Sequence, residues 1–482
     1  MSATKITRAV ASIALTACLA VAATNTGAQA GTAQLGATPR NTDFNGDGYN
    51  DVAAASPYYG RDSANWYVPG KAAVLYGGPN GLSGHELISP EPGCTSYDGG
   101  GAAIACRFWG LTLGAADSDK DGRTDLHVGG LGDVRALGWK PGGITKVEEH
   151  RSPTLAKVTT PALVAPFDRQ PRADVLVLEE GRISGWYDAQ TPYYSVALPE
   201  VRDVRVTETT YSGVTHGDVD GGFDQEIAAI QTRYLTDQAT GDFWVEYHLV
   251  VVDLWEETAM VNELAATAFC SSTQVCPEER SKLAMGDVNG DRFDDLVMAT
   301  PGRNVLHVWY GSATGLRGGP SYTARDLPWL SLDVASLAVG DVTGDGFAEI
   351  ALGRPGTGWT SPGLQGDVVL VPGSRSGPVP AAAQLVSQDG VGPLAGPAAG
   401  DPIGEQGQGG DRFGATVSIL DVTGDGMGDL IVGAPGKKAR AGMLAVVRGA
   451  AGGASATQAQ VVHAAQLGLT APNAGFGTTL LR

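Results

Sequence analysis

Short apolar runs recur along the chain, and the clearest of them begin directly after turns rich in Gly and Asp. Leu296-Val297-Met298 and Leu430-Ile431-Val432 are two examples. Apolar runs of this length, bounded by turn residues, predict buried strands. A second set of apolar runs, at residues 72–76, 305–310 and 368–371, ends each time in a Gly-rich turn. The pattern therefore predicts an all-β protein.

A further short strand is expected ahead of the acidic turns, and in the clearest copies it starts with Phe-Gly or a near equivalent. Phe413-Gly414 precedes Asp421, and Phe108-Trp109-Gly110 precedes Asp117. The repeating unit is then strand, acidic loop, strand, third strand, turn and fourth strand. A small antiparallel sheet of four strands is one blade of a β-propeller.

The acidic loop has nine residues, with oxygen-bearing side chains at positions 1, 3, 5 and 9. Its clearest copy is Asp421-Val422-Thr423-Gly424-Asp425-Gly426-Met427-Gly428-Asp429. Glycines at positions 4 and 6 allow the sharp backbone turn that points these side chains inward. Oxygen ligands in a flexible arrangement favour calcium over magnesium, and position 7 can add its backbone carbonyl. The loop therefore predicts a calcium site between two strands.

Five full copies of the loop occur with one spacing, so the sequence predicts about five calcium ions. The expected ligands, with position 7 contributing its carbonyl, are Asp43, Asn45, Asp47, Tyr49 and Asp51; Asp117, Asp119, Asp121, Arg123 and Asp125; Asp287, Asn289, Asp291, Phe293 and Asp295; Asp341, Thr343, Asp345, Phe347 and Glu349; and Asp421, Thr423, Asp425, Met427 and Asp429.

Two further segments depart from the pattern. The copy with Asp218, Asp220 and Glu226 has no oxygen side chain at position 5, so a calcium site and a solvated acidic turn are both open for it. The segment 166–174 begins with Pro166 in place of the first ligand, and it is interpreted as a turn without metal.

An EF-hand is the first alternative, because its loop begins in the same way. An EF-hand needs a bidentate Glu at position 12 and a helix on each side. Position 12 is Ala54, Val128, Met298, Leu352 or Val432, and most of these lie in strand-like runs. The calcium loops are therefore expected to join strands.

Length supports an array of repeats. A chain of 482 residues exceeds what one ordinary core supports, and repeats at this spacing predict a repeat architecture. Loop starts at 43, 117, 166, 218, 287, 341 and 421 define seven units within residues 41–482. The prediction is a seven-bladed β-propeller with calcium-binding loops between strands.

The N-terminus resembles a secretory signal. Lys5 and Arg8 precede an apolar core over residues 9–23, and Ala28-Gln29-Ala30 fits a cleavage site. Residues 1–30 are thus expected to be removed, which leaves residues 31–40 as a short polar lead. The apolar stretch is too short for a membrane span. Cys18 sits in a lipobox-like segment and offers lipid anchoring as a minor alternative to secretion.

The net charge limits the expected binding partners, and the cysteine content indicates the cellular compartment. The formal net charge of -19 argues against nucleic acid and anionic membranes as partners. Outside the signal, Cys94, Cys106, Cys270 and Cys276 predict two disulfides in an exported protein. Three connectivities are possible, and proximity in sequence favours Cys94–Cys106 and Cys270–Cys276.

The two chain ends carry complementary halves of the repeat. Phe476-Gly477 stands at the C-terminus with no loop after it, whereas the Asp43 loop has no Phe-Gly strand before it. The segment 476–481 is therefore expected to supply the inner strand beside residues 51–55 and to close the propeller.

These motifs resemble a known family. Phe413-Gly414, the loop 421–429 and Val432-Gly433-Ala434-Pro435 are similar to the FG-GAP repeat, also called the VCBS repeat, of the seven-bladed propeller in integrin alpha subunits. The resemblance is strongest over residues 281–440, and it implies calcium at blade loops on one face of a disc. Integrin function does not follow, since a fold supports many functions.

The function expected from the sequence is a secreted, monomeric, calcium-stabilised binding module that recognises a protein or a glycan in an adhesion-like role. No His-Glu-x-x-His, Gly-x-Ser-x-Gly or P-loop motif occurs, so the sequence gives no catalytic residue. The alternative is a hydrolase or lyase acting on polysaccharide or phosphoester at the central channel, because residues that meet across a channel leave no local motif.

Overall fold

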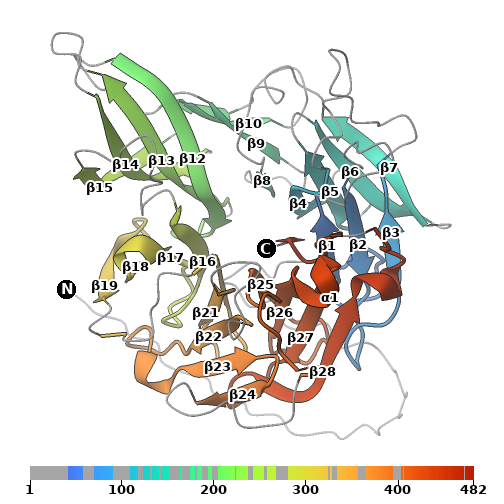
Figure 1. Cartoon of the computed structure of the whole chain (residues 1–482). Coiled ribbons are helices and arrows are strands. Elements are labelled where there is room, and N and C mark those ends of the chain that lie inside the picture. The colour runs from blue at the N-terminus through green and yellow to red at the C-terminus, as the bar shows by residue number, and fades with distance from the viewer. Residues whose placement is uncertain are drawn as a thin grey trace, which may run out of the picture. The chain divides into compact units, whose positions relative to one another are not determined.

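A computed structural model gives the fold of the chain, and its ribbon is drawn in Figure 1. The structure describes residues 42–57, 70–90, 109–117, 121, 123–130, 133–140, 143–150, 163–165, 174–179, 182–186, 194–197, 205–222, 224–236, 243–254, 258–267, 280–323, 326–327, 334–356, 365–393, 403–404, 406–471 and 473–481. The expected signal peptide, the polar lead and the four cysteines of the predicted disulfides lie outside these residues.

The described residues form seven separate antiparallel sheets. The first four, in sheet order, are β29 (Thr479–Leu480), β1 (Val52–Ser56), β2 (Lys71–Leu75) and β3 (His85–Ile88); β4 (Thr112–Ala116), β5 (Asp125–Gly130), β6 (Asp133–Lys140) and β7 (Gly143–His150); β8 (Leu163–Ala165), β9 (Asp174–Glu179), β10 (Arg182–Trp186) and β11 (Tyr194–Ala197); and β12 (Arg205–Gly217), β13 (Glu226–Thr236), β14 (Phe243–Asp253) and β15 (Thr258–Thr267).

The other three sheets complete the array. They are β16 (Lys282–Gly286), β17 (Asp295–Thr300), β18 (Val305–Tyr310) and β19 (Arg317–Thr323); β20 (Ser336–Gly340), β21 (Glu349–Arg354), β22 (Asp367–Val371), β23 (Gln384–Ser387) and β24 (Gly390–Pro393); and β25 (Thr416–Leu420), β26 (Asp429–Ala434), β27 (Met443–Arg448) and β28 (Ser455–His463). Short helical turns are η4 (Pro301–Arg303), η5 (Pro380–Ala382), α1 (Lys437–Arg440) and η6 (Ala464–Leu467).

The second strand of each well-described sheet is its most buried part. In β26 all six residues are buried, and β17 and β1 are buried throughout as well. These strands are the apolar runs that follow the acidic loops, and they pair on both sides, β26 with β25 and with β27. A strand covered on both faces reads as a continuous apolar run rather than an alternating one.

Apolar clusters join successive sheets. Val342, Val368 and Leu370 pack with Val417, Leu430 and Val432 between the sheets of β20–β24 and β25–β28. Similar clusters join the sheets of β16–β19 and β20–β24, of β12–β15 and β16–β19, of β8–β11 and β12–β15, and of β1–β3 and β4–β7. Sheets packed face to face in chain order are the arrangement of a β-propeller, so the prediction of an all-β propeller is confirmed.

The C-terminal segment lies beside the first sheet. Thr479 pairs with Ala55 and Leu480 with Ala54, so β29 extends the sheet of β1–β3 beside β1, and the C-terminus lies near β1 in Figure 1. Phe476 is fully buried in a cluster that includes Val52 and Val422. The pairing expected between the two chain ends is therefore present, although the regular strand has two residues and not the six expected.

Two local expectations were wrong. The Phe-Gly pair does not start the regular strand, because Phe413 forms an isolated bridge with Gly366 and β25 begins only at Thr416. Gly414 has φ of +85°, and a side chain there would collide with the carbonyl oxygen of Asp367, so glycine is needed for this close approach. The blade was expected to have four strands, yet in this sheet β24 pairs with β23 as a fifth strand.

No helix among the described residues has the length and apolar character that crossing a membrane requires.

Candidate metal sites

The acidic loops occupy equivalent places in six sheets. Each is named after its first residue. The Asp117, Asp218, Asp287, Asp341 and Asp421 loops connect the first strand of a sheet to the second, and the Asp43 loop leads directly into β1. Position 9 of each loop is the first residue of the second strand or the residue before it. The loops therefore connect strands, as expected, and the EF-hand alternative is excluded for them.

The carboxylate at position 1 organises the four full loops that the structure describes throughout, those of Asp43, Asp287, Asp341 and Asp421. In the Asp421 loop, the backbone N–H of Gly424 donates to Oδ1 of Asp421 at 2.7 Å and that of Gly426 donates to Oδ2 at 2.9 Å. Corresponding bonds to Asp43, Asp287 and Asp341 come from the same loop positions. The glycines at these positions have positive φ, which is why the sequence places glycine there.

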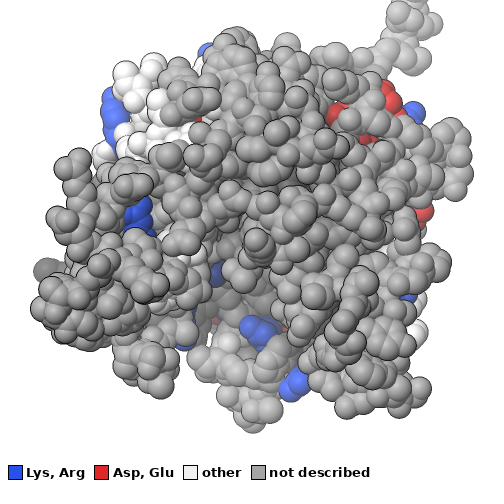
Figure 2. Space-filling model, turned by 90° about the horizontal axis from the view of Figure 1, so that it is seen from above, with Lys and Arg blue, Asp and Glu red and all other residues white. Residues whose placement is uncertain are grey.

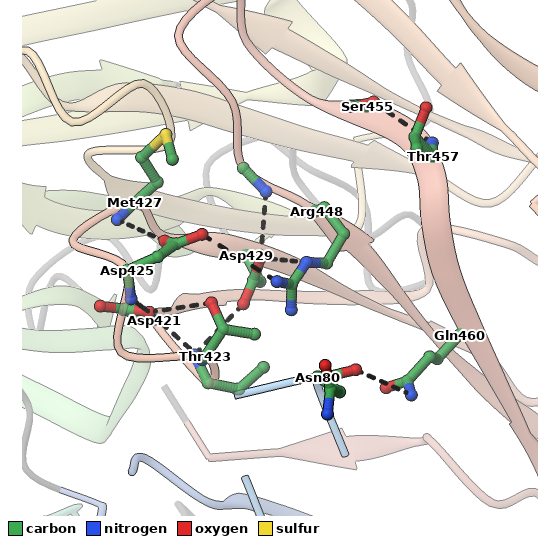
Figure 3. Close-up of polar contacts among 12 residues, drawn as sticks. Asn80, Asp421, Thr423, Asp425, Met427, Asp429, Arg448, Ser455, Thr457 and Gln460 are labelled. Atoms are coloured by element: carbon green, nitrogen blue, oxygen red, sulfur yellow. Dashed lines mark hydrogen bonds and ion pairs between the residues drawn. The ribbon is translucent and has the colours of Figure 1, made fainter. Parts of the chain in front are cut away.

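The carboxylate at position 5 is held in the same way in every full loop. Oδ1 of Asp425 accepts from the N–H of Met427 at 3.0 Å, and its Oδ2 faces Arg448 (Figure 3). Asp47, Asp121, Asp291 and Asp345 make the corresponding bond to the residue at position 7. The side chains at positions 1 and 5 are thus pre-arranged by backbone donors.

The carboxylate at position 9 is buried. Asp51 and Asp295 are 0% exposed, and Asp429 and Glu349 are 1% exposed. One oxygen accepts from the N–H at position 2, as from Val422 at 3.3 Å. In three loops the other accepts from the glycine after the third strand: Gly77, Gly311 and Gly449. In these three loops the position-9 residue therefore ties the loop to the end of the third strand.

Burial raises the pKa of these position-9 carboxyl groups. The pKa is raised to about 7 for Asp51, to about 8 for Asp295 and to about 7 for Glu349, with the nearby carboxylates of positions 1 and 5 adding to the effect of burial. Asp429 rises only to about 6, because the N–H of Gly449 and then the guanidinium of Arg448 oppose the effect of burial. Crowded, buried carboxylates of this kind are stabilised in their ionised form by a cation.

Arg448 was not identified from the sequence. Its Nε lies 3.8 Å from Oδ1 of Asp429, and its Nη2 lies 4.0 Å from Oδ2 of Asp425 (Figure 3). It ends β27 and stands across the sheet from Asp429, one residue before Gly449. The signal that finds such a residue is its place before the turn glycine of the third strand, where the Asp43, Asp287 and Asp341 repeats have Tyr76, Tyr310 and Pro372.

Neighbouring loops contact one another. The N–H at position 8 donates to the position-1 carbonyl of the preceding loop, from Gly428 to Asp341 at 2.7 Å, from Ala348 to Asp287 at 2.8 Å and from Asp294 to Asp218 at 2.7 Å. The side chain of Asn50 makes the equivalent bond to Asp421 at 3.0 Å. In addition, the position-7 side chain packs on the position-4 glycine of the preceding loop, as Phe347 does on Gly290. The described loops thus form a continuous belt.

Some predicted ligands lie outside the described residues or in an incomplete site. Asp119 is not among the described residues of the Asp117 loop, and most of the segment 166–174 is also outside them. In the Asp218 loop, the N–H of Gly221 donates to Oδ1 of Asp218 at 2.6 Å, as in the full loops. Ligand atoms of Asp218, Asp220 and Glu226 lie within 4.8 Å of one another, close enough to surround one ion.

The donor sets fit calcium. Apart from the backbone carbonyl at position 7, the side chains predicted as ligands in each full loop offer carboxylate, amide or hydroxyl oxygens, which calcium prefers. No thiolate or imidazole belongs to these sets, and this argues against zinc or copper.

Comparison with known families agrees with this geometry. The FG-GAP repeat matches residues 35–74, 334–371 and 413–447, and the FG-GAP-like repeat matches residues 287–352. This chain contains FG-GAP and FG-GAP-like repeats. The resemblance expected from the sequence is confirmed, and each match to the FG-GAP repeat spans an acidic loop and the strand after it.

Other comparisons show fold similarity at most. No curated protein matches the chain. A protein described as a 6-phosphogluconolactonase of Bacteroides uniformis has a TM-score of 0.41 and 11% identity, covering 86% of this chain and 97% of its own. The Nup133 β-propeller domain of Vanderwaltozyma polyspora has a TM-score of 0.37 and 9% identity, covering 82% and 89%. Similarity of this size transfers no activity to the FG-GAP chain.

Proposed function

We propose that the chain is an exported, seven-bladed FG-GAP propeller whose five full loops bind calcium, and that it acts as a binding module for a protein or a glycan. The observation that carries the calcium proposal is the belt of loops, in which the position-1 and position-8 residues of adjacent loops are hydrogen bonded. Calcium held in one loop would fix the contacts of that loop with its neighbours.

The blade count is part of the proposal. Seven sheets and the inner pairing of β29 with β1 support a closed ring of seven blades. Closure of the ring through the chain ends leaves no inner sheet edge unpaired, which protects against edge-to-edge aggregation.

A rigid scaffold with long connecting segments supports a binding role, because such segments carry recognition in many folds. Charge gives no reason to propose a polyanionic ligand. On the face shown in Figure 2, Lys and Arg side chains of described residues stand in small separate groups. The formal net charge of -19 also disfavours nucleic acid.

Calcium removal tests the first half of the proposal. A ligand that binds only the folded state stabilises it by mass action. We therefore expect EDTA to lower the melting temperature, and calcium to restore it better than the same concentration of magnesium. Asp421→Asn should reduce the calcium-dependent rise, whereas Asp326→Asn, a change at an exposed carboxylate outside the loops, should not. An unchanged melting curve in EDTA would contradict the calcium proposal.

Ligand capture tests the second half. The calcium-loaded protein is immobilised and exposed to a glycan array and to proteins of the producing culture, with an EDTA-treated sample as the control. Calcium-dependent retention without turnover supports a binding module. Release of product from polysaccharide or phosphoester substrates would instead support the hydrolase or lyase alternative.

A further inference from the structure

The loop that departs from the FG-GAP pattern carries carboxylates that the full loops lack. The Asp218 loop has Gly222 at position 5, where the full loops have Asp, and Asp224 at position 7, where they have Tyr, Arg, Phe or Met. A Cβ atom built on Gly222 would lie 2.9 Å from Oδ1 of Asp220 and 3.0 Å from Oδ1 of Asp224. The carboxylate of Asp224 therefore reaches the space that a position-5 side chain would enter.

A second additional carboxylate comes from the third strand. Ile227 pairs with Val252, so Asp253 at the end of β14 stands across the sheet from Glu226. This is the position at which Arg448 faces Asp429 in the Asp421 repeat. The Asp421 repeat places a positive side chain beside its position-9 carboxylate, whereas the Asp218 repeat places a third acidic group there. Asp224, Glu226 and Asp253 are 6%, 4% and 9% exposed.

These three residues converge. Their ligand atoms lie within 4.8 Å of one another, which is the separation expected of oxygens that share one ion at a typical calcium–oxygen distance. Glu226 also belongs to the triad with Asp218 and Asp220, so two triads meet at one carboxylate. A cluster of acidic residues alone would not indicate a site, because such clusters also occur without a cation.

The hydrogen bonding of the Glu226 carboxylate supplies an independent observation. Oε2 accepts a hydrogen bond from the N–H of Val219 at 2.8 Å, on the side of the loop. Oε1 is buried and has no hydrogen-bond partner. In three full loops the corresponding second oxygen accepts from the glycine after the third strand, but Leu254 occupies that place here. A buried carboxylate oxygen left without a donor is costly unless another group satisfies it.

We propose that Asp224, Glu226 and Asp253 hold a hard divalent cation, calcium by preference, at a site separate from that of the Asp218 loop, with Glu226 shared between the two. The cation satisfies Oε1 of Glu226 and offsets the charge of Asp224 and Asp253. Carboxylate oxygens alone make up the protein ligands, and the flexible geometry of calcium accommodates three of them together with water. The FG-GAP nonapeptide supplies no such site, because Asp253 comes from β14.

The test compares Asp253→Asn with Asp326→Asn, which makes the same change at an exposed carboxylate in the turn after β19. Both proteins and the wild type are equilibrated with a calcium concentration that saturates the wild type, and bound metal is measured. Asp253→Asn should bind fewer ions by about one per chain or more, since Asn removes one charged ligand of three. Asp326→Asn should match the wild type. Equal stoichiometry in all three proteins would overturn the proposal.

The melting temperature gives a second measurement, because the effect of Asp253→Asn should differ between EDTA and calcium. In EDTA, Asp253→Asn should melt at the same temperature as the wild type or higher, because one of the facing charges is gone. In calcium it should melt lower. Asp224→Asn should behave in the same way and provides the test if Asp253→Asn does not fold. A variant that melts higher in both conditions would show a cluster stabilised by protons only and would overturn the site.

The inference and the proposed function fail separately. Asp421→Asn reports on a full loop and Asp253→Asn on the new site. If only Asp421→Asn loses bound calcium, the proposal for the full loops is supported and the proposed site at Asp253 is overturned. If only Asp253→Asn loses bound calcium, the site at Asp253 is supported and the proposal that the Asp421 loop binds calcium is overturned.

Discussion

The position-9 carboxylates are expected to affect both the folding stability of the protein and its affinity for metal. Their pKa values in the folded chain, about 7 for Asp51, 8 for Asp295 and 7 for Glu349, lie above the ordinary values of these groups because the groups are buried. Without a cation, each binds a proton in the folded state at a pH at which the unfolded chain has lost it. Such a group contributes stability below its unfolded pKa and loses it as the pH rises through the folded pKa.

The metal-free protein should therefore become less stable as the pH rises from about 5 to about 8. Urea unfolding in EDTA at several pH values measures this dependence. In saturating calcium the slope should be smaller or reversed, because the ion stabilises the ionised carboxylates and protons compete with it. A free energy of unfolding that increases with pH in EDTA would contradict the assignment.

Arg448 should act as a partial substitute for a cation in the Asp421 loop. Arg448→Gln removes the positive charge 3.8 Å from Asp429 and 4.0 Å from Asp425. In EDTA we expect a loss of about 1 kcal/mol, since the facing carboxylates lose a partly buried partner. The stabilisation gained on adding calcium should exceed that of the wild type. Arg375→Gln, at an exposed residue, is the control and should change neither quantity.

At the scale of the loop, the repeats differ in which residue occupies position 6, where the backbone has a positive φ. Position 6 has positive φ in the Asp43, Asp341 and Asp421 loops, where it is glycine, and in the Asp287 loop, where it is Arg292 with φ of +77°. A side chain at this conformation is strained by about 1–2 kcal/mol. A Cβ atom on Gly426 would meet no neighbouring atom, so only strain would oppose a substitution there.

Gly426→Ala should therefore destabilise the protein by about 1 kcal/mol, and Arg292→Gly should stabilise it by about 0.5 kcal/mol after the entropy of glycine is subtracted. Chemical denaturation of both variants measures the two effects, in calcium and in EDTA. Changes of the same sign in the two variants would show that loop strain is not the controlling factor.

For the whole molecule, the C-terminal segment has an effect beyond its length. Phe476 is fully buried between residues of the first sheet and of the sheet of β25–β28. Removing a buried Phe side chain costs about 3–5 kcal/mol, so Phe476→Ala should lower the free energy of unfolding by that amount. Deletion of residues 475–482 should destabilise the propeller further, because it also removes the pairing with β1.

Urea unfolding measures both changes, and Gln458→Ala in β28 serves as a control at an exposed residue. If the deletion leaves the midpoint of unfolding unchanged, the end segment does not close the fold. A two-state transition that moves as a whole would show that the blades unfold together.

Local chemistry in the sequence determined the strands and the loops. The apolar runs after Asp295 and Asp429 became buried second strands, and the Asp-x-Asn-x-Asp or Asp-x-Thr-x-Asp spacing with its glycines gave the same loop hydrogen bonds in repeat after repeat. These features depend on residues within nine positions of one another, so a linear pattern contains them. The pairing of the chain ends was also predictable, because each end carries half of a repeated unit.

Tertiary structure alone decided which residues from elsewhere face the loops. Arg448 and Asp253 lie 19 and 27 residues after the position-9 carboxylates that they face, and only the pairing of the second strand with the third brings them there. The belt contacts, such as Gly428 to Asp341, join different repeats. Register and blade-to-blade packing are properties of the folded chain, and they set the charge around each loop that a nine-residue pattern leaves open.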